Sequence, residues 1–445
     1  MVESAIQIMK ARAISILRTL RDAGHQAYLV GGCVRDVLLG HEPSDYDVAT
    51  DATPAQVMSI FPETYAVGAQ FGVVLVPMGE GLEPVEVATF RSDVSYSDGR
   101  HPDAVRFSKT AREDVERRDF TINGLLLDPI TNEVLDYVNG KQDLEAGVIR
   151  AIGEPERRFT EDKLRMLRAV RFAARFGYEI EPATVAAIEK LAGEIHQVSH
   201  ERIADELTKM LTEGRARRAF ELLEETGLLS SVLPEVAAMK GIAQPPQFHP
   251  EGDVWIHTLM LLEQLMPGCS RTQAWGALLH DVGKPPTFRV APDRIRFDGH
   301  VEVGVKMAAA ICRRLRFSND DTEQILALIE HHMRFGDVMR MKESTLKKFL
   351  RLPLFSEHLE QHRLDCLASH RDLSLYDCVR EKLAATPPEK MRPTPLITGN
   401  DLIAAGYQPG ARFKQILSAV EDAQLENRLQ SKEEAMKFVM QEFAR

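Results

Sequence analysis

Two glycines and an arginine near the N-terminus have the types and spacing of a phosphate site. The apolar run Ala27–Val30 meets Gly31 and Gly32, and the helix-forming stretch that follows contains Arg35. Glycines at a strand-to-helix turn let backbone N–H groups approach a phosphate closely, and the arginine adds a charged donor one turn later. A glycine pair alone is equally typical of an ordinary turn, so the residues that follow it must distinguish a phosphate site from such a turn.

Asp45 and Asp47 follow, two residues apart, in a segment with strand character. Because side chains alternate along a strand, both carboxylates are expected on one face, with their backbones about 7 Å apart. This separation suits two divalent ions about 4 Å apart, held between the carboxylates and a nucleoside triphosphate. An Asp-x-Asp pair alone is more typical of a solvated turn. The glycine pair, one helix and then the aspartate pair, in this order, favour the phosphate and metal site.

The stretch Leu29–Gly40 reads Leu-Val-Gly-Gly-Cys-Val-Arg-Asp-Val-Leu-Leu-Gly, and the aspartate pair follows it. This pattern resembles the signature of the superfamily that contains class II tRNA nucleotidyltransferases and bacterial poly(A) polymerases. The resemblance implies that Asp45 and Asp47 are catalytic and hold Mg²⁺. It also implies that the two glycines and Arg35 bind the nucleotide.

A second motif, Arg117–Asn123, reads Arg-Arg-Asp-Phe-Thr-Ile-Asn. Two adjacent arginines are usually a solvated pair, but the polar residues beside them can read a ribose hydroxyl. The heptad resembles the family motif for triphosphate and ribose recognition, which implies that Arg118, Asp119 and Asn123 bind the nucleotide. Glu86, a polar residue in an apolar strand, is either a third acidic group near the aspartate pair or the partner of an arginine.

The segment Glu161–Phe172 has apolar residues at helical spacing with charged residues beside them, and it resembles the fourth motif of the family. Asp162 and Arg165 are expected on one helix face. A carboxylate accepts from an exocyclic amine and a guanidinium donates to a ring nitrogen, so this pair suits cytosine and adenine but not uracil or guanine. The resemblance implies that Arg168 and Arg171 contact the nucleotide or its phosphates.

A further set of histidines and aspartates lies in the second half of the chain. A single histidine on an apolar helix is usually a core residue, but a His…His-Asp…Asp series over several helices resembles the HD superfamily of metal-dependent phosphohydrolases. The resemblance implies that a divalent transition metal is bound, because ligand sets rich in imidazole bind such metals. The expected ligands are His257, His280, Asp281 and Asp365, with His300 and His331–His332 nearby. The alternative is a relic fold that is kept for packing.

The composition limits the classes of protein. The chain has 445 residues and a net charge of −11, which argues against a general nucleic-acid coat, so contacts with RNA are expected to be local. Apolar runs stay short of the roughly 20 residues that span a bilayer, so no membrane association is expected. The five cysteines are scattered without a close pair, which favours a reducing cytoplasm. The oligomeric state is left open between monomer and homodimer.

The expected fold class is α+β, with a nucleotidyltransferase head of mixed sheet and helices, followed by an all-α neck, an HD-type body and a tail. The expected domains are residues 1–153, 154–244, 245–384 and 385–445 in that order. Strands are expected at Ala27–Val30, Gly72–Val76, Val85–Phe90, Val105–Ser108 and Val148–Ile152. A linker around residues 385–395 is rich in proline.

The resemblance implies template-independent addition or repair of the 3′-terminal CCA of tRNA, with tRNA, CTP and ATP as partners. A poly(A) polymerase is the near alternative, although Val67–Gly72 lacks the arginine-rich form associated with those enzymes. A partial enzyme that adds only A or only CC is also open. Against the CC-only form, Arg91–Pro102 resembles a complete version of the family's flexible loop. An alternative of another class is a metal-dependent HD phosphohydrolase with a tRNA-binding head.

Overall fold

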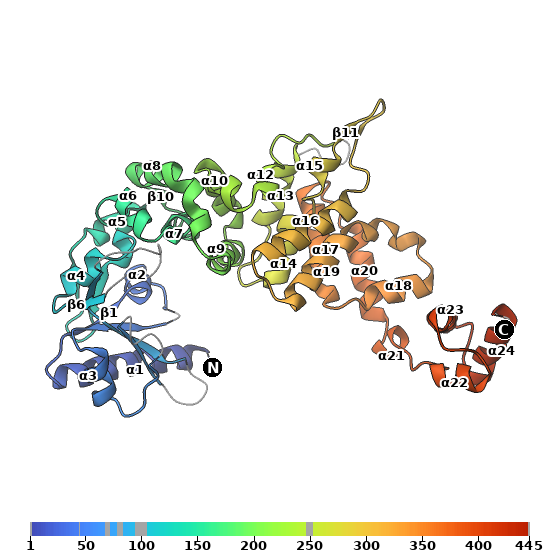
Figure 1. Cartoon of the computed structure of the whole chain (residues 1–445), viewed down its shortest axis with the longest axis horizontal. Coiled ribbons are helices and arrows are strands. Elements are labelled where there is room, and N and C mark those ends of the chain that lie inside the picture. The colour runs from blue at the N-terminus through green and yellow to red at the C-terminus, as the bar shows by residue number, and fades with distance from the viewer. Residues whose placement is uncertain are drawn as a thin grey trace. The chain divides into compact units, whose positions relative to one another are not determined.

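The computed structural model of the chain describes residues 2–43, 45–66, 72–77, 83–93, 105–245 and 252–443. Most of Val67–Gly72 and of the loop Arg91–Pro102, which bear on the alternatives above, lies outside these described residues. The chain divides into two compact units, residues 1–237 and 238–445. Each unit is described by itself below, and Figure 1 shows the order of its elements along the chain.

A six-stranded sheet forms the centre of the first unit, in the order β3-β4-β2-β1-β7-β8. The strands are β1 (Ala27–Val30), β2 (Asp47–Thr50), β3 (Val73–Val76), β4 (Val85–Thr89), β7 (Leu125–Asp128) and β8 (Glu133–Asp136). The pair β2 and β4 is parallel and the other neighbours are antiparallel, which confirms the predicted mixed sheet. Two short pairs lie beside it, β5 (Arg91–Asp93) with β6 (Val105–Phe107) and β9 (Val148–Ile149) with β10 (Glu179–Ile180).

Helices cover this sheet and bury its apolar side chains. The helices of this part are α1 (Val2–Asp22), α2 (Gly32–Leu38), α3 (Pro54–Ile60), α4 (Ala111–Glu116), α5 (Gly140–Ala146) and the 3₁₀ helix η2 (Thr121–Asn123). In Figure 1, α1 and α3 lie side by side below the sheet. Val30, Ala49 and Leu126, from three neighbouring strands, pack with Phe90 in one buried cluster. The sheet thus fixes the ends of β1 and β2, where the glycine and aspartate pairs lie.

The first unit continues as helices. They are α6 (Pro155–Glu161), α7 (Leu164–Phe176), α8 (Pro182–Leu191), the 3₁₀ helix η3 (Ala192–Gln197), α9 (His200–Thr212), α10 (Ala216–Glu225), α11 (Leu228–Val232) and α12 (Pro234–Ala237). The apolar stripe Leu164, Leu167 and Val170 of α7 is buried, as the sequence pattern predicts. The helix α7 packs against α9 and α10.

The second unit is almost entirely helical. Its helices are α13 (Val254–Glu263), α14 (Arg271–Leu279), α15 (Lys284–Thr287), α16 (His300–Arg314), α17 (Asn319–His331), the 3₁₀ helix η4 (His332–Arg340), α18 (Glu343–Leu350), α19 (Phe355–Ala368), α20 (Ser374–Ala385), α21 (Pro388–Met391), α22 (Gly399–Ala404), α23 (Ala411–Leu425) and α24 (Lys432–Glu442). A short hairpin, β11 (Arg289–Val290) with β12 (Ile295–Arg296), interrupts them.

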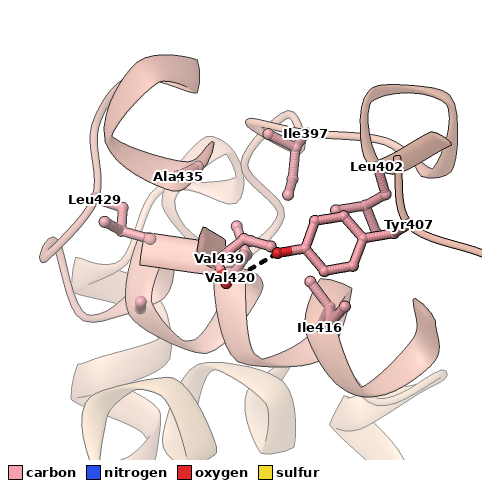
Figure 2. Packing of buried hydrophobic residues seen from close by; sticks show 9 residues of the cluster. Ile397, Leu402, Tyr407, Ile416, Val420, Leu429, Ala435 and Val439 are labelled. Carbon is pink, nitrogen blue, oxygen red and sulfur yellow. Dashed lines mark hydrogen bonds between the residues drawn. The ribbon is translucent and has the colours of Figure 1, made fainter. Parts of the chain in front are cut away.

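The last helices enclose a small hydrophobic core of their own. Tyr407 lies at its centre among Ile416, Val420 and other buried side chains (Figure 2). Its hydroxyl donates to the carbonyl oxygens of Val439 and Phe443, so this buried polar group is satisfied at the end of α24.

None of the helices in the described part of the chain combines the length and the hydropathy needed to cross a bilayer.

Candidate functional site

The glycine pair lies at the strand-to-helix turn that the sequence predicts, because β1 ends at Val30 and α2 begins at Gly32. Gly31 has φ +78° and ψ −133°, a backbone conformation that other residues rarely adopt. A Cβ atom on Gly31 would lie 3.7 Å from an Arg118 nitrogen and 3.9 Å from an Asp47 carboxylate oxygen. The backbone of this turn therefore faces a group of charged side chains.

The aspartate pair differs from the prediction in its local structure. The strand β2 begins at Asp47, so Asp45 precedes the strand and is not part of it. The reason is the length of the neighbouring strand β1. Its last residue, Val30, pairs with Asp47, and the glycine turn after Val30 offers no strand partner to the residues that precede Asp47. Both carboxylates nevertheless line one pocket together with the two glycines.

The charge of Asp47 is disfavoured where it lies. Burial, and then the negative charges of Asp45 and Glu86, raise the pKa of Asp47 to about 7. Glu86 lies on β4, parallel to β2, and lines a neighbouring pocket of about 270 Å³ with both aspartates. Of its two predicted roles, the third acidic group fits this position. A divalent cation among these oxygen ligands would remove the repulsion, and carboxylate oxygens are the donors that Mg²⁺ prefers.

The pocket at the glycine turn has a volume of about 300 Å³ and combines acidic and basic side chains. Six further residues that are predicted to bind the nucleotide line this pocket: Arg35, Arg118, Asp119, Asn123, Arg168 and Arg171. The other two, Asp162 and Arg165, line an adjoining pocket. Carboxylates at one end and guanidinium groups around them can bind metal ions and a polyphosphate together.

Hydrogen bonds join several of these residues into one network. Arg35 donates to the side-chain oxygen of Asn123 over 2.7 Å, and Asn123 donates to Asp119 over 3.0 Å. Arg168 donates to the other Asp119 oxygen over 2.7 Å. Burial alone would raise the pKa of Asp119, but the charge of Arg168 and the Asn123 hydrogen bond lower it to about 2. Asp119 is therefore ionised and fixed in place, and it orients the groups on both sides.

The adjoining pocket has a volume of about 260 Å³ and contains Asp162 and Arg165. It shares Arg118, Asp119 and Arg168 with the pocket at the glycine turn, so the two pockets form one continuous site. A nucleotide that placed its phosphates at the glycine turn could place its base in the adjoining pocket.

The predicted common helix face of Asp162 and Arg165 is wrong. The helix α6 ends at Glu161 and α7 begins at Leu164, so Asp162 lies between two helices with an extended backbone. Its carboxylate accepts a hydrogen bond from the Leu164 backbone N–H over 3.0 Å, an arrangement that short acidic side chains favour over a continuous helix. The carboxylate also pairs with Arg202 of α9 over 2.7 Å. Arg202 had no local sequence signal, because it lies 40 residues away.

Arg165 and Arg171 are held by partners within the chain. Arg165 pairs with Glu161 over 3.0 Å and donates to the Arg117 carbonyl oxygen over 3.1 Å. Arg171 is buried and pairs with Glu206 over 2.7 Å. These contacts fix the direction of both guanidinium groups before any nucleotide is bound.

In the second unit, the four predicted metal ligands come together from three parts of the fold. His257 is on α13, His280 and Asp281 follow α14, and Asp365 is on α19. The Nε2 atom of His257 lies 3.1 Å from an Asp365 oxygen and 3.3 Å from Nε2 of His280. His280 Nε2 lies 3.2 Å from Asp281.

His280 presents the lone pair that a metal needs. Nδ1 of His280 lies 2.9 Å from the Ala277 carbonyl oxygen, so it carries the proton and leaves Nε2 to face the cluster. Burial opposes the ionisation of Asp365, but the hydrogen bond and charge of His257 hold its pKa well below the usual range. The free Nε2 of His280 and the ionised carboxylate of Asp365 are donors of the kind that a divalent transition metal binds, and His257 would join them on losing the Nε2 proton that it gives to Asp365.

Two histidines near the cluster have no role in the four-ligand prediction. His300 and His332 point their Nε2 atoms at Asp281, over 4.0 Å and 3.9 Å. Burial lowers the pKa of both, and that of His332 falls to about 4. The neighbouring His331 packs instead against Phe349, so only one residue of the His-His pair joins the cluster.

Family models match three segments of this chain. Residues 27–150 match the poly A polymerase head domain, residues 177–240 a probable RNA- and SrmB-binding site of polymerase A, and residues 254–370 the HD domain. The segments follow one another in the order of the predicted head, neck and HD-type body.

Known proteins resemble the chain over different lengths. A CCA-adding enzyme of Geobacillus sp. strain WCH70 is 32% identical over 93% of this chain and 92% of its own length. A CCA-adding enzyme of Bacillus pumilus is 46% identical over 48% of this chain, which spans about half of that relative (53%). The crystal structure of the Bacillus stearothermophilus CCA-adding enzyme in complex with CTP has a TM-score of 0.73, 27% identity and 96% coverage of both chains.

Proposed function

This chain belongs to the CCA-adding enzyme family, and on that premise we propose that it adds or repairs the 3′-terminal CCA of tRNA from CTP and ATP without a nucleic-acid template. The observation that carries the proposal is the continuous site of the first unit. There, a carboxylate pair and several arginines line one pocket, and Asp162 and Arg165 line the pocket that adjoins it. The names of the relatives favour this activity over poly(A) synthesis.

The proposal also divides the chain into four domains. Residues 1–153 would be the catalytic head, 154–244 the neck that contacts tRNA, 245–384 the HD-type body and 385–445 the tail. The three matched families follow this order. A tRNA-processing role places the enzyme in the cytoplasm, where its nucleotide substrates and tRNA are found.

Asp45 and Asp47 would hold Mg²⁺, with Glu86 as a third acidic group. When bound, the ions would lower the pKa of the tRNA 3′-hydroxyl and offset the charge of the departing pyrophosphate. In the reaction, the 3′-oxygen forms a bond to the α-phosphorus, and the bond from this phosphorus to the oxygen that bridges to the β-phosphate breaks. The raised pKa of Asp47 indicates that its proton must leave before a cation binds.

The remaining residues of the pocket position the nucleotide. The backbone at Gly31 and Gly32 lets phosphate oxygens approach closely, and the guanidinium groups of Arg35, Arg118 and Arg171 compensate their charge. Asp119 and Asn123 would accept and donate at the ribose hydroxyls, and Arg168 holds Asp119 in the orientation that this requires.

Asp162 and Arg165 would choose the base. Their pocket shares three residues with the phosphate pocket, so the base and the triphosphate can be held at the same time. The carboxylate would accept from the exocyclic amine of cytosine or adenine, and the guanidinium would donate to the adjacent ring nitrogen.

A set of tRNA transcripts tests the activity. Transcripts that end before the CCA, after its first C and after its second C are incubated with Mg²⁺ and with labelled CTP or ATP. The proposal expects CTP incorporation on the first two, ATP incorporation on the third, and termination after A. Extension past the first A would indicate a poly(A) polymerase, and the loss of either nucleotide's incorporation would indicate a partial enzyme. The Asp45→Ala variant is the blank.

A second activity is proposed for the HD site, because four metal-binding side chains converge there in a buried cluster. A divalent transition metal at His257, His280, Asp281 and Asp365 would support hydrolysis of phosphomonoesters or 2′,3′-cyclic phosphates, such as those on damaged tRNA ends. Metal-loaded protein is assayed on both substrates. Activity that His280→Ala removes and Asp45→Ala leaves intact supports this proposal, and its absence supports a packing role.

A further inference from the structure

A buried carboxylate lies behind the nucleotide site of the first unit and lines neither of the two pockets described above. Asp114, on α4, is 1% exposed, and its neighbours Ala111 and Val115 pack into the core cluster beneath the sheet. This packing holds the helix, and with it the carboxylate, in a fixed place. Asp114 precedes the motif Arg117–Asn123 and has no role in the site as described so far.

Two adjacent arginines converge on this carboxylate. Arg117 donates from Nε and Nη2 to Oδ1 of Asp114, over 3.0 Å and 2.7 Å. Arg118 donates from Nε and Nη2 to Oδ2, over 3.3 Å and 3.0 Å. Burial alone would raise the pKa of Asp114, but the charges of Arg118 and Arg117 lower it, so the carboxylate is ionised. One carboxylate thus holds each guanidinium group by two of its nitrogens, an arrangement that fixes direction as well as distance.

The third nitrogen of Arg118 faces the pocket at the glycine turn. Its Nη1 atom lies 3.7 Å from the position that a Cβ atom on Gly31 would take, and Arg118 lines both pockets. Because Asp114 binds the Nε edge of this guanidinium group, the group turns its Nη1 end toward the place where a triphosphate would lie. Asp114 therefore sets the direction of a charge that the phosphates would meet.

Arg117 connects the same carboxylate to the adjoining pocket. Its backbone carbonyl oxygen accepts a hydrogen bond from Nη2 of Arg165 over 3.1 Å, and both arginines line that pocket. Arg165 is one of the two residues proposed to choose the base. Since Asp114 holds the side chain of Arg117, it also bears on the direction of Arg165.

Stability alone is a weak reason for these three charged groups to meet. Their removal from water is costly, and buried ion pairs are often no more stabilising than apolar side chains of similar volume. A bidentate pair supplies a fixed geometry instead. Here the geometry is imposed on two arginines that both belong to the wall of the adjoining pocket.

We propose that Asp114 is a positioning residue for nucleotide binding, which orients Arg118 toward the triphosphate and, through Arg117, holds Arg165 in the direction that reads the base. This inference rests on the proposed function and deepens it, because one carboxylate outside both pockets couples phosphate binding with base choice. Asp114 acts through these arginines and does not touch the nucleotide.

Binding and kinetics of an isosteric variant test the proposal. Asp114→Asn keeps the size of the side chain and removes its charge. The Kd of CTP, titrated without tRNA, and the KM for CTP are each expected to rise about tenfold or more, because hydrogen bonds to charged groups are strong. The preference for CTP over UTP should fall about threefold, the effect of one weakened hydrogen bond. A role in packing alone would lower the fraction of active enzyme, and hence kcat, but would leave Kd, KM and the preference unchanged.

The matched control is Glu113→Gln, which removes the other acidic side chain in the first turn of α4. It should keep the wild-type Kd, KM and base preference. Circular dichroism checks that each variant is folded. Asp114→Glu takes the place of Asp114→Asn if the latter does not fold, because it keeps the charge but moves the carboxylate by one methylene group, and it should raise Kd and KM as well. A folded Asp114 variant with the wild-type Kd and KM for CTP would overturn the inference.

The outcomes separate this inference from the proposed function. Wild-type protein that binds CTP but does not extend tRNA would reject the proposed function, and the Kd of Asp114→Asn would still test the positioning role. Wild-type protein that completes the CCA end, together with an Asp114→Asn variant that binds CTP equally well, would reject the positioning role alone. A raised Kd with an unchanged base preference would reject the link to Arg165.

Discussion

At the scale of single residues, the charge of Asp47 connects stability with activity. Its pKa lies near 7 in the folded protein and near 3.8 in the unfolded chain. Between these pH values the folded state binds the proton more tightly, so the free energy of unfolding falls as the pH rises through this interval. Above pH 7 the full cost of the ionised carboxylate is present.

We therefore expect Asp47→Asn to stabilise the metal-free protein while it abolishes nucleotide addition. At pH 8 the free energy of unfolding should rise by about 1 kcal/mol or more, since one unit of pKa shift corresponds to about 1.4 kcal/mol. At pH 4 the gain should vanish. Urea unfolding of the first unit without divalent cations measures both values. Glu42→Gln, which neutralises an exposed carboxylate nearby, is the control, and an equal gain at both pH values would contradict this account.

Base choice is also a matter of single side chains. Asp162→Ala should raise the incorporation of UTP and GTP relative to CTP and ATP by about tenfold or more, because each lost or mismatched base contact is worth about 1–3 kcal/mol. A four-nucleotide assay on tRNA without its CCA end measures the ratios. The control is Lys190→Gln, which breaks an exposed ion pair with Glu156 and should leave the ratios unchanged. Equal slowing of all four nucleotides by Asp162→Ala would refute the role.

At the scale of elements, the phosphate pocket depends on close backbone packing behind it. Gly140 begins α5, and a Cβ atom there would lie 2.2 Å from the Thr121 carbonyl oxygen of η2. The helix η2 carries Asn123, which joins Arg35 to Asp119. Two backbone segments in such contact cannot separate without moving that network.

Gly140→Ala should consequently destabilise the first unit by about 2–4 kcal/mol and weaken nucleotide binding as well. Thermal unfolding and CTP titration measure the two effects. Gly193→Ala is the control, because a Cβ atom at Gly193 would meet nothing within 4 Å. Wild-type affinity for CTP in Gly140→Ala would contradict the positioning role of this contact.

The elements also show what the sequence could and could not predict. Short, β-branched runs bounded by turns identified β1, β3, β4 and β6 to within a residue at either end. β7, which lies next to β1 in the sheet, was missed, because the run Leu125-Leu126-Leu127 has no alternation and leucine suits helices equally well. The expected strand Val148–Ile152 ends after two residues, since β10, with which it pairs, is equally short, and Ala151 forms an isolated bridge with Phe120 instead.

The site residues also divide into those that the sequence could locate and those that it could not. Motifs contiguous in sequence, such as the glycine turn and the His-Asp pair, could be located from residue types alone. Ion-pair partners could not, because Arg202 and Glu206 reach Asp162 and Arg171 from another helix. The break at Asp162 was hidden as well, since a helical stripe continues on both sides of it and only the side-chain cap reveals the interruption.

At the scale of the whole molecule, the two units have separate ligands in our proposals: nucleotide in the first and transition metal in the second. Both tryptophans of the chain, Trp255 and Trp275, are buried in the second unit. Tryptophan fluorescence therefore follows the unfolding of that unit alone.

We expect a transition metal to raise the fluorescence-detected unfolding temperature, because a ligand at a hundred times its dissociation constant adds about 2.7 kcal/mol to the stability of the state that binds it. CTP with Mg²⁺ should leave this temperature unchanged. It should instead raise the temperature at which the first unit unfolds, as circular dichroism detects it. The control is the His257→Gln variant, measured in the presence of the same metal. A fluorescence transition that shifts equally with CTP would mean that the units unfold as one.

The two pockets described in the first unit share Arg118, Asp119 and Arg168, so under the proposed function they form one place that either nucleotide can occupy. CTP and ATP are then competitive inhibitors of each other's incorporation. Each step of synthesis must wait for the unwanted nucleotide to dissociate, and a surplus of either one slows the step that consumes the other. The rate at which a tRNA end is completed therefore depends on the ratio of the two nucleotide pools as well as on their individual concentrations.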